Sequence, residues 1–66
     1  MKYQVTFFDK ENRYKPVATI IDAPHRVAIY QGEYKKAIVN ICQKRGWTVK
    51  EFKNYGYVNW KCRKAE

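Results

Sequence analysis

Residues 22–46 read DAPHRVAIYQGEYKKAIVNICQKRG, and this stretch decides the fold. Its apolar residues recur at intervals of three and four, which places them on one face of a helix. These residues are Val27, Tyr30, Tyr34, Ala37, Ile38, Ile41 and Cys42. Asp22 followed by Pro24 is typical of a helix start, and Gly46 after two cations is typical of a helix end. The stretch therefore predicts one amphipathic helix, whose apolar face needs a partner layer.

Gly32 lies in the middle of this predicted helix, where a glycine costs about 1 kcal/mol relative to alanine. Residues 27–30 (VAIY) also suit a short strand, in which case the helix begins after Gly32. We expect the long helix rather than this alternative. Tyr30 and Tyr34 are four residues apart, so they should stack on the same helical face.

The residues before the predicted helix suit an antiparallel hairpin. Apolar and polar residues alternate in residues 2–8 (KYQVTFF), which predicts a strand with one buried face. Residues 14–21 (YKPVATII) predict a second strand. This strand lies at the edge of a sheet near Pro16, because proline cannot donate a hydrogen bond to a neighbouring strand. The polar residues 9–13 form the connection between the two strands.

The residues after the predicted helix suit a second hairpin. Residues 47–53 (WTVKEFK) predict a third strand, residues 54–56 (NYG) a turn, and residues 57–63 (YVNWKCR) a fourth strand. The predicted fold is therefore a small α+β domain of the ββαββ type. In this domain, one helix packs on an antiparallel sheet of two hairpins.

Length and composition limit what the chain can be. A chain of 66 residues fills one core, so we expect a single domain over residues 1–66 without a cleft between domains. Hydrophobic residues make up 45% of the chain, which is too much for a disordered basic tail. The formal net charge of +8 favours a polyanionic or acidic partner.

Few residues offer catalytic chemistry. The chain has no serine and one histidine, His25, and its two cysteines stand 20 residues apart without the spacing of zinc ligands. We therefore expect no enzyme activity, no metal or other cofactor, no small-molecule substrate, and two buried thiols. The sequence shows no apolar run of the length of a signal peptide or a membrane span, so we expect a cytoplasmic protein without a membrane partner.

Alternation in residues 57–63 separates a core side, with Val58, Trp60 and Cys62, from a solvent side. The same reasoning applied to the other strands predicts one open sheet face. Its predicted residues are Lys2, Gln4, Thr48, Lys50, Tyr57, Asn59, Lys61 and Arg63. Thr48 and Lys50 join this face if Trp47 and Val49 point to the core.

This mixture of cations, polar groups and a ring favours nucleic-acid binding. Cations neutralise phosphates, rings stack on bases, and amides reach base edges. Cations and rings also alternate in the predicted second hairpin, which adds Lys53 and the turn residue Tyr55. The predicted nucleic-acid-binding residues are Lys2, Lys50, Lys53, Tyr55, Tyr57, Asn59, Lys61 and Arg63. We expect single-stranded or structured DNA or RNA as the partner, because no recognition helix with base-reading residues stands out.

Two alternatives stay open. A polar sheet face also serves solubility alone. Free strand edges favour a protein-interaction module, which forms a homodimer through an edge strand or adds a strand to an acidic partner. The hairpin–helix–hairpin pattern resembles that of many small proteins of bacteria and phages, and this resemblance implies no particular activity.

Overall fold

The computed structural model describes residues 1–11 and 15–65, which contain three strands and three helices. The strands are β1 (Lys2–Asp9), β2 (Val17–Asp22) and β3 (Tyr57–Lys64), and the helices are α1 (Arg26–Ala28), α2 (Tyr34–Arg45) and α3 (Val49–Asn54). A kinked helical segment, η1 (Ile29–Glu33), joins α1 to α2. Residues 12–14, which belong to the predicted first connection and the start of the predicted second strand, lie outside the described residues.

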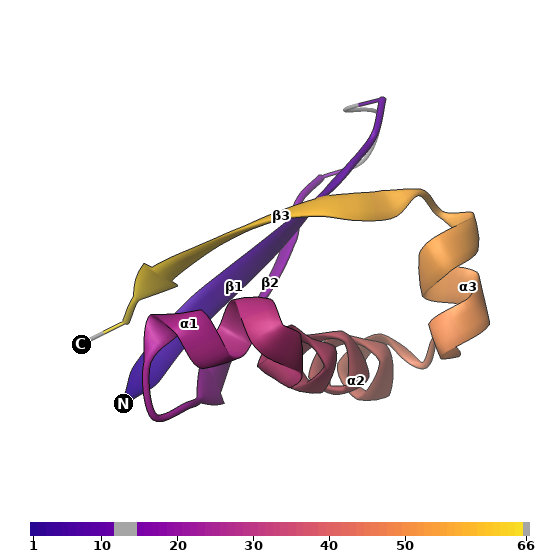
Figure 1. The fold of residues 1–66 in the computed structure, drawn as a ribbon. Helices are drawn as coiled ribbons and strands as arrows, with labels where there is room; N and C mark the ends of the chain where they lie inside the picture. The colour runs from indigo at the N-terminus through magenta and orange to yellow at the C-terminus, as the bar shows by residue number, and fades with distance from the viewer. Residues whose placement is uncertain (12–14, 66) are drawn as a thin grey trace.

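The three strands form one antiparallel sheet in the order β2-β1-β3. The central strand β1 pairs with β2 and β3, so that Val5 lies opposite Thr19 on one side and Cys62 on the other. Helices α1 and α2 lie on one side of the sheet, α3 lies beyond its end, and no described element covers the other side (Figure 1). The α+β class, the first hairpin and the open antiparallel sheet are thus confirmed.

The predicted ββαββ arrangement is wrong at its third strand, because α3 occupies most of residues 47–53. Thr48 and Glu51 form a reciprocal capping box at the start of α3. Glu51 donates its backbone N–H to Thr48 Oγ1 at 3.1 Å, and Thr48 donates its backbone N–H to Glu51 Oε1 at 2.9 Å. These two bonds satisfy amide groups that a short helix otherwise leaves unpaired. The second predicted hairpin is therefore a helix followed by one strand.

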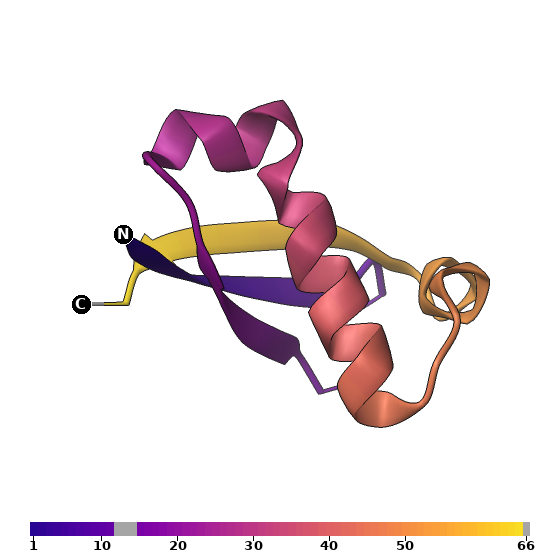
Figure 2. The same ribbon diagram turned by 90° about the horizontal axis from the view of Figure 1, so that it is seen from below.

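The predicted long helix is interrupted at Gly32, whose backbone has φ 142° and ψ −19°. Helices α1 and α2 consequently run in different directions (Figure 2). Residues 27–30 are helical, so the alternative of a short strand there is wrong. The helix also begins later than expected, since Asp22 ends β2 and the cap of α1 is His25, whose Nδ1 accepts the N–H of Ala28 at 3.1 Å. The predicted end at Gly46 is confirmed, with φ 70°.

The core lies between the sheet and the helices. The inward side chains of β1 are Tyr3, Val5 and Phe7, and all are buried. They belong to one cluster with Val17 and Ile21 of β2 and with Ile29, Ala37, Ile41 and Phe52 of the helical elements. Phe52 meets the Phe7 ring edge-on at 5.1 Å and stacks on Tyr57 at 5.2 Å, which ties α3 to the sheet.

The break at Gly32 also changes which apolar residues reach the core. Val27 and Tyr30 belonged to the predicted stripe, yet they are 57% and 58% exposed because their segment turns away from α2. Tyr30 and Tyr34 both stack on Trp60, at ring distances of 4.9 and 5.3 Å. No helix within residues 1–11 and 15–65 is long and apolar enough to cross a membrane.

Candidate nucleic-acid interface

One face of the sheet is left uncovered by the helices, and we call it the open face. Side chains alternate along a strand, so every second residue of each strand points to this side. The residues of the open face are Lys2, Gln4, Thr6 and Phe8 of β1, Ala18, Ile20 and Asp22 of β2, and Asn59, Lys61 and Arg63 of β3. The register places Gln4 opposite Arg63, Thr6 opposite Lys61, and Phe8 opposite Asn59. The face therefore combines residues from the two ends of the chain.

Arg63 is held in place by the amide of Gln4. Its Nε and Nη2 atoms donate to Gln4 Oε1 at 3.1 and 2.8 Å. Arg63 nevertheless remains exposed at the surface. The cross-strand pair thus fixes one edge of a guanidinium group whose charge is accessible to a ligand.

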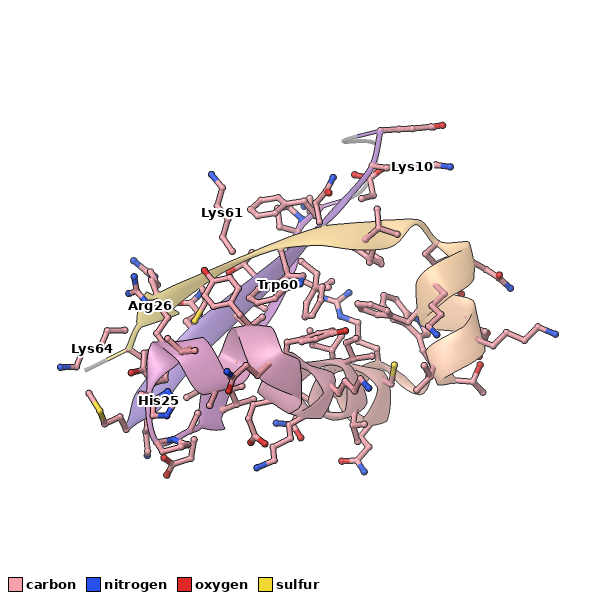
Figure 3. The ribbon with its side chains drawn as sticks, viewed as in Figure 1. Lys10, His25, Arg26, Trp60, Lys61 and Lys64 are labelled. Carbon is pink, nitrogen blue, oxygen red and sulfur yellow. The ribbon has the colours of Figure 1, made fainter. Side chains whose placement is uncertain are left out.

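Lys61 and Phe8 form a second cross-strand pair. The Lys61 Nζ atom lies 5.9 Å from the centre of the Phe8 ring, within the range of a cation–π contact. Figure 3 shows the Lys61 side chain pointing away from the helices, whereas its neighbour Trp60 points toward them. Phe8, Asn59 and Lys61 line a shallow hollow of about 360 Å³, together with Asp9 and Lys10 from the end of β1. A partly exposed ring therefore lies beside an exposed ammonium group.

The charge of the open face is predominantly positive. Among its described residues the cations are Lys2, Lys61 and Arg63, and the carboxylate is Asp22, at the end of the outer strand β2. The buried Asp9 adds a second carboxylate to the lining of the hollow beside Lys61. The N-terminal ammonium group hydrogen-bonds Asp22 Oδ1 at 2.9 Å and holds the pKa of this carboxyl below its usual range, with a smaller contribution from Lys2. Asp22 is therefore ionised at neutral pH and already engaged by the N-terminus, whereas Lys61 and Arg63 are the exposed cations of the β3 side.

The structure brings together five of the residues predicted on the open face: Lys2, Gln4, Asn59, Lys61 and Arg63. Thr48 and Lys50 do not lie on this face, because Thr48 caps α3 and Lys50 lies on that helix. Lys53, predicted as a binding residue of the second hairpin, lies on the same helix. Tyr55 also lies off this face, where it caps the end of α3 and packs edge-on against Trp47 at 4.9 Å.

Tyr57 was also predicted on the open face, but it is buried on the opposite side. The cause is a bulge in β3, since Phe8 lies opposite Asn59 while Asp9 lies opposite Tyr57, which leaves Val58 as an additional residue. The extra residue reverses the alternation, so Tyr57 points inward and donates its hydroxyl to the backbone oxygen of Lys15 at 3.3 Å. Val58, predicted in the core, is 59% exposed.

The ring of the open face is Phe8, which was not among the predicted residues. The sequence does indicate this position, because Phe8 continues the alternation of Lys2, Gln4 and Thr6. No protein-family model, curated protein or solved structure matches this chain. The geometry of the chain itself therefore carries the functional argument.

Proposed function

We propose that the open face binds single-stranded nucleic acid, either DNA or RNA. The observation that supports this function is the exposed cation Lys61 beside the Phe8 ring, on a sheet face that no described helix covers. A second exposed cation, Arg63, lies two residues further along β3 on the same face. A sheet that presents rings and cations together is a common platform for unpaired bases. As part of the same proposal, the protein acts in the cytoplasm as an accessory protein of a bacterium or phage, as expected from the sequence pattern.

Each group of the open face has a distinct role in this proposal. Lys61, Arg63 and Lys2 neutralise phosphates, which releases condensed counterions and makes the affinity depend on salt. Phe8 stacks on one base, a contact that contributes about 1–3 kcal/mol. Asn59 offers an amide that donates to and accepts from base edges. The arrangement favours a flexible strand over a duplex, because unpaired bases expose their faces for stacking.

The test is fluorescence anisotropy with a labelled single-stranded oligonucleotide of about 12 nucleotides, repeated at increasing salt. The double variant Lys61→Ala/Arg63→Ala should reduce the slope of log affinity against log salt by about 1.4, since each phosphate contact contributes about 0.7 for a single strand. Phe8→Leu should weaken binding about ten-fold without changing the slope, because leucine keeps the apolar volume but removes the ring.

The matched control is Lys44→Ala/Lys50→Ala, which removes the same charge from exposed positions on α2 and α3. This control should keep most of the affinity. The proposal is wrong if the unmodified protein does not bind at low salt. It is also wrong if the control weakens binding as much as the open-face variant does.

We propose edge-strand pairing as a second candidate function, because β2 and β3 are outer strands whose far edges pair with no other described strand. A second copy or an extended acidic segment of another protein would continue the sheet there. Size-exclusion chromatography with light scattering tests the homodimer. A dimer that persists at high salt and ignores nucleic acid would favour this function over the first.

A further inference from the structure

A second surface lies on the helical side of the sheet, away from the open face. It is a groove of about 590 Å³ between α2, α3 and the start of β3. Its walls include Tyr34 and Ile38 of α2 and Phe52 of α3, and Trp60 contributes from β3. Figure 3 shows Trp60 pointing from β3 toward the helices. The groove is therefore lined mostly by apolar and aromatic side chains.

Three exposed valines line the same groove, one from each element. They are Val39 of α2, 44% exposed, Val49 of α3, 43% exposed, and Val58 of β3, 59% exposed. Single exposed apolar residues are ordinary, but several that converge on one hollow indicate a contact surface. The bulge in β3 contributes to this surface, because Val58 is the additional residue of the bulge.

The charges at the groove have one sign. Lys35 of α2 and Lys53 of α3 both line it, on opposite walls, and none of the described residues in its lining is acidic. A ligand that fits must therefore present apolar groups to the groove and negative charge to both walls. Two cations on opposite walls also match a ligand that carries carboxylates on two sides of an apolar stripe.

We propose that this groove binds an acidic amphipathic helix of a partner protein. The apolar stripe of that helix enters between α2 and α3, and its flanking carboxylates meet Lys35 and Lys53. A helix fits this place because two of its three walls are themselves helices, joined by residues 46–48. The partner helix thus forms a third helix on the same side of the sheet. This inference is independent of nucleic-acid binding, since the two surfaces use different residues.

The test uses two synthetic helical peptides as probes. Both carry leucines at the spacing of one helical face, and they differ only in having glutamate or lysine beside this stripe. Binding is measured by calorimetry and by the fluorescence of Trp60 in a Trp47→Phe background. The glutamate peptide should bind, and the lysine peptide should bind at least about ten-fold more weakly.

Substitutions at the groove give the decisive comparison. Val39→Ser/Val49→Ser should lower the affinity for the glutamate peptide about ten-fold. Val27→Ser, at an exposed valine of α1 outside the groove, should leave this affinity unchanged. Lys35→Glu/Lys53→Glu should reverse the preference between the two peptides. Its control, Lys44→Glu/Lys50→Glu, changes the net charge equally and should leave the preference in place.

The inference is overturned if the glutamate peptide does not bind, if both peptides bind equally, or if the groove and control variants weaken binding equally. Binding of a small anionic dye such as anilinonaphthalene sulfonate, without binding of the glutamate peptide, also overturns it and assigns the groove to small amphiphiles. The variant Lys61→Ala/Arg63→Ala should bind the peptide normally. This last result separates a failure of the groove from a failure of the open face.

Discussion

Burial controls the chemistry of both cysteine thiols. Cys42 is buried on α2, and its Sγ atom lies 3.7 Å from the backbone oxygen of Thr48. Burial raises the pKa of this thiol, and the negative charge of Glu51 raises it further. Burial also raises the pKa of the partly buried Cys62, although the nearby charge of Arg26 acts in the opposite direction. Both thiols therefore hold their proton more tightly at neutral pH than a free cysteine does.

We expect both thiols to react slowly with a disulfide reagent such as dithionitrobenzoate, because the thiolate is the reactive form. Cys42 should react more slowly than Cys62, since it is the more buried of the two. The single variants Cys42→Ala and Cys62→Ala isolate each rate, and the same proteins in denaturant give the reference. Each rate should rise with pH over a higher range in the folded protein than in the unfolded chain. A folded-state rate equal to the unfolded one at either position would contradict this prediction.

The residues of the open face differ in how far sequence alone could place them. Asn59, Lys61 and Arg63 were predicted correctly because they lie in a regular part of β3, where alternation fixes the face of each residue. Tyr57 was predicted on the wrong face, because the bulge at Val58 depends on the pairing of β3 with β1. The local pattern of residues 57–63 does not show how this strand pairs with β1.

Gly32 decides the direction of the helices at the scale of elements. Its φ of 142° lies in a region that side chains disfavour, and a Cβ atom there would meet nothing within 4 Å. The cost of a substitution is therefore one of backbone strain rather than of collision. We expect Gly32→Ala to lower the free energy of unfolding by about 1–3 kcal/mol, measured by urea denaturation.

Gly46 provides the matched control, because its φ of 70° and ψ of 25° fall in the left-handed region that asparagine tolerates. Gly46→Asn should therefore lower the free energy of unfolding clearly less than Gly32→Asn does. Equal costs at the two glycines would mean that the backbone at Gly32 relaxes into an ordinary helix. In that case α1 and α2 would straighten, and Val27 and Tyr30 would move toward the apolar side of α2.

Helix α3 shows why one element was mispredicted. Residues 47–50 (WTVK) alternate as a strand would, but Phe52 falls on the polar side of that alternation. The Thr48–Glu51 capping box and the burial of Phe52 together favour a helix of six residues, which would be unstable in isolation. The capping box was visible in the sequence. The burial of Phe52 was not, because it depends on the sheet residues Phe7 and Tyr57.

At the scale of the whole molecule, one thin core supports two separate surfaces. The open face depends on the register between β1 and β3, and the groove depends on the position of α3 against β3. The helix end at Gly46 and the alternation of β1 could be predicted, because short-range pattern determines them. The bulge in β3 and the position of α3 against the sheet could not be predicted, since each results from contact between residues more than 40 positions apart.

Phe52 is where these long-range contacts converge, so its truncation should affect the whole fold. A domain of this length has a free energy of unfolding of about 3–10 kcal/mol. Phe52 is 1% exposed, and Phe→Ala at a buried site costs about 3–5 kcal/mol. Phe52→Ala should therefore leave a large fraction of the protein unfolded, as measured by urea denaturation with tryptophan fluorescence. Phe52→Leu should cost less, and Lys50→Ala on the exposed side of α3 should change stability by no more than about 0.5 kcal/mol. A loss below about 1 kcal/mol for Phe52→Ala would mean that α3 contributes little to the core, and that the groove beside it is not held in a fixed shape.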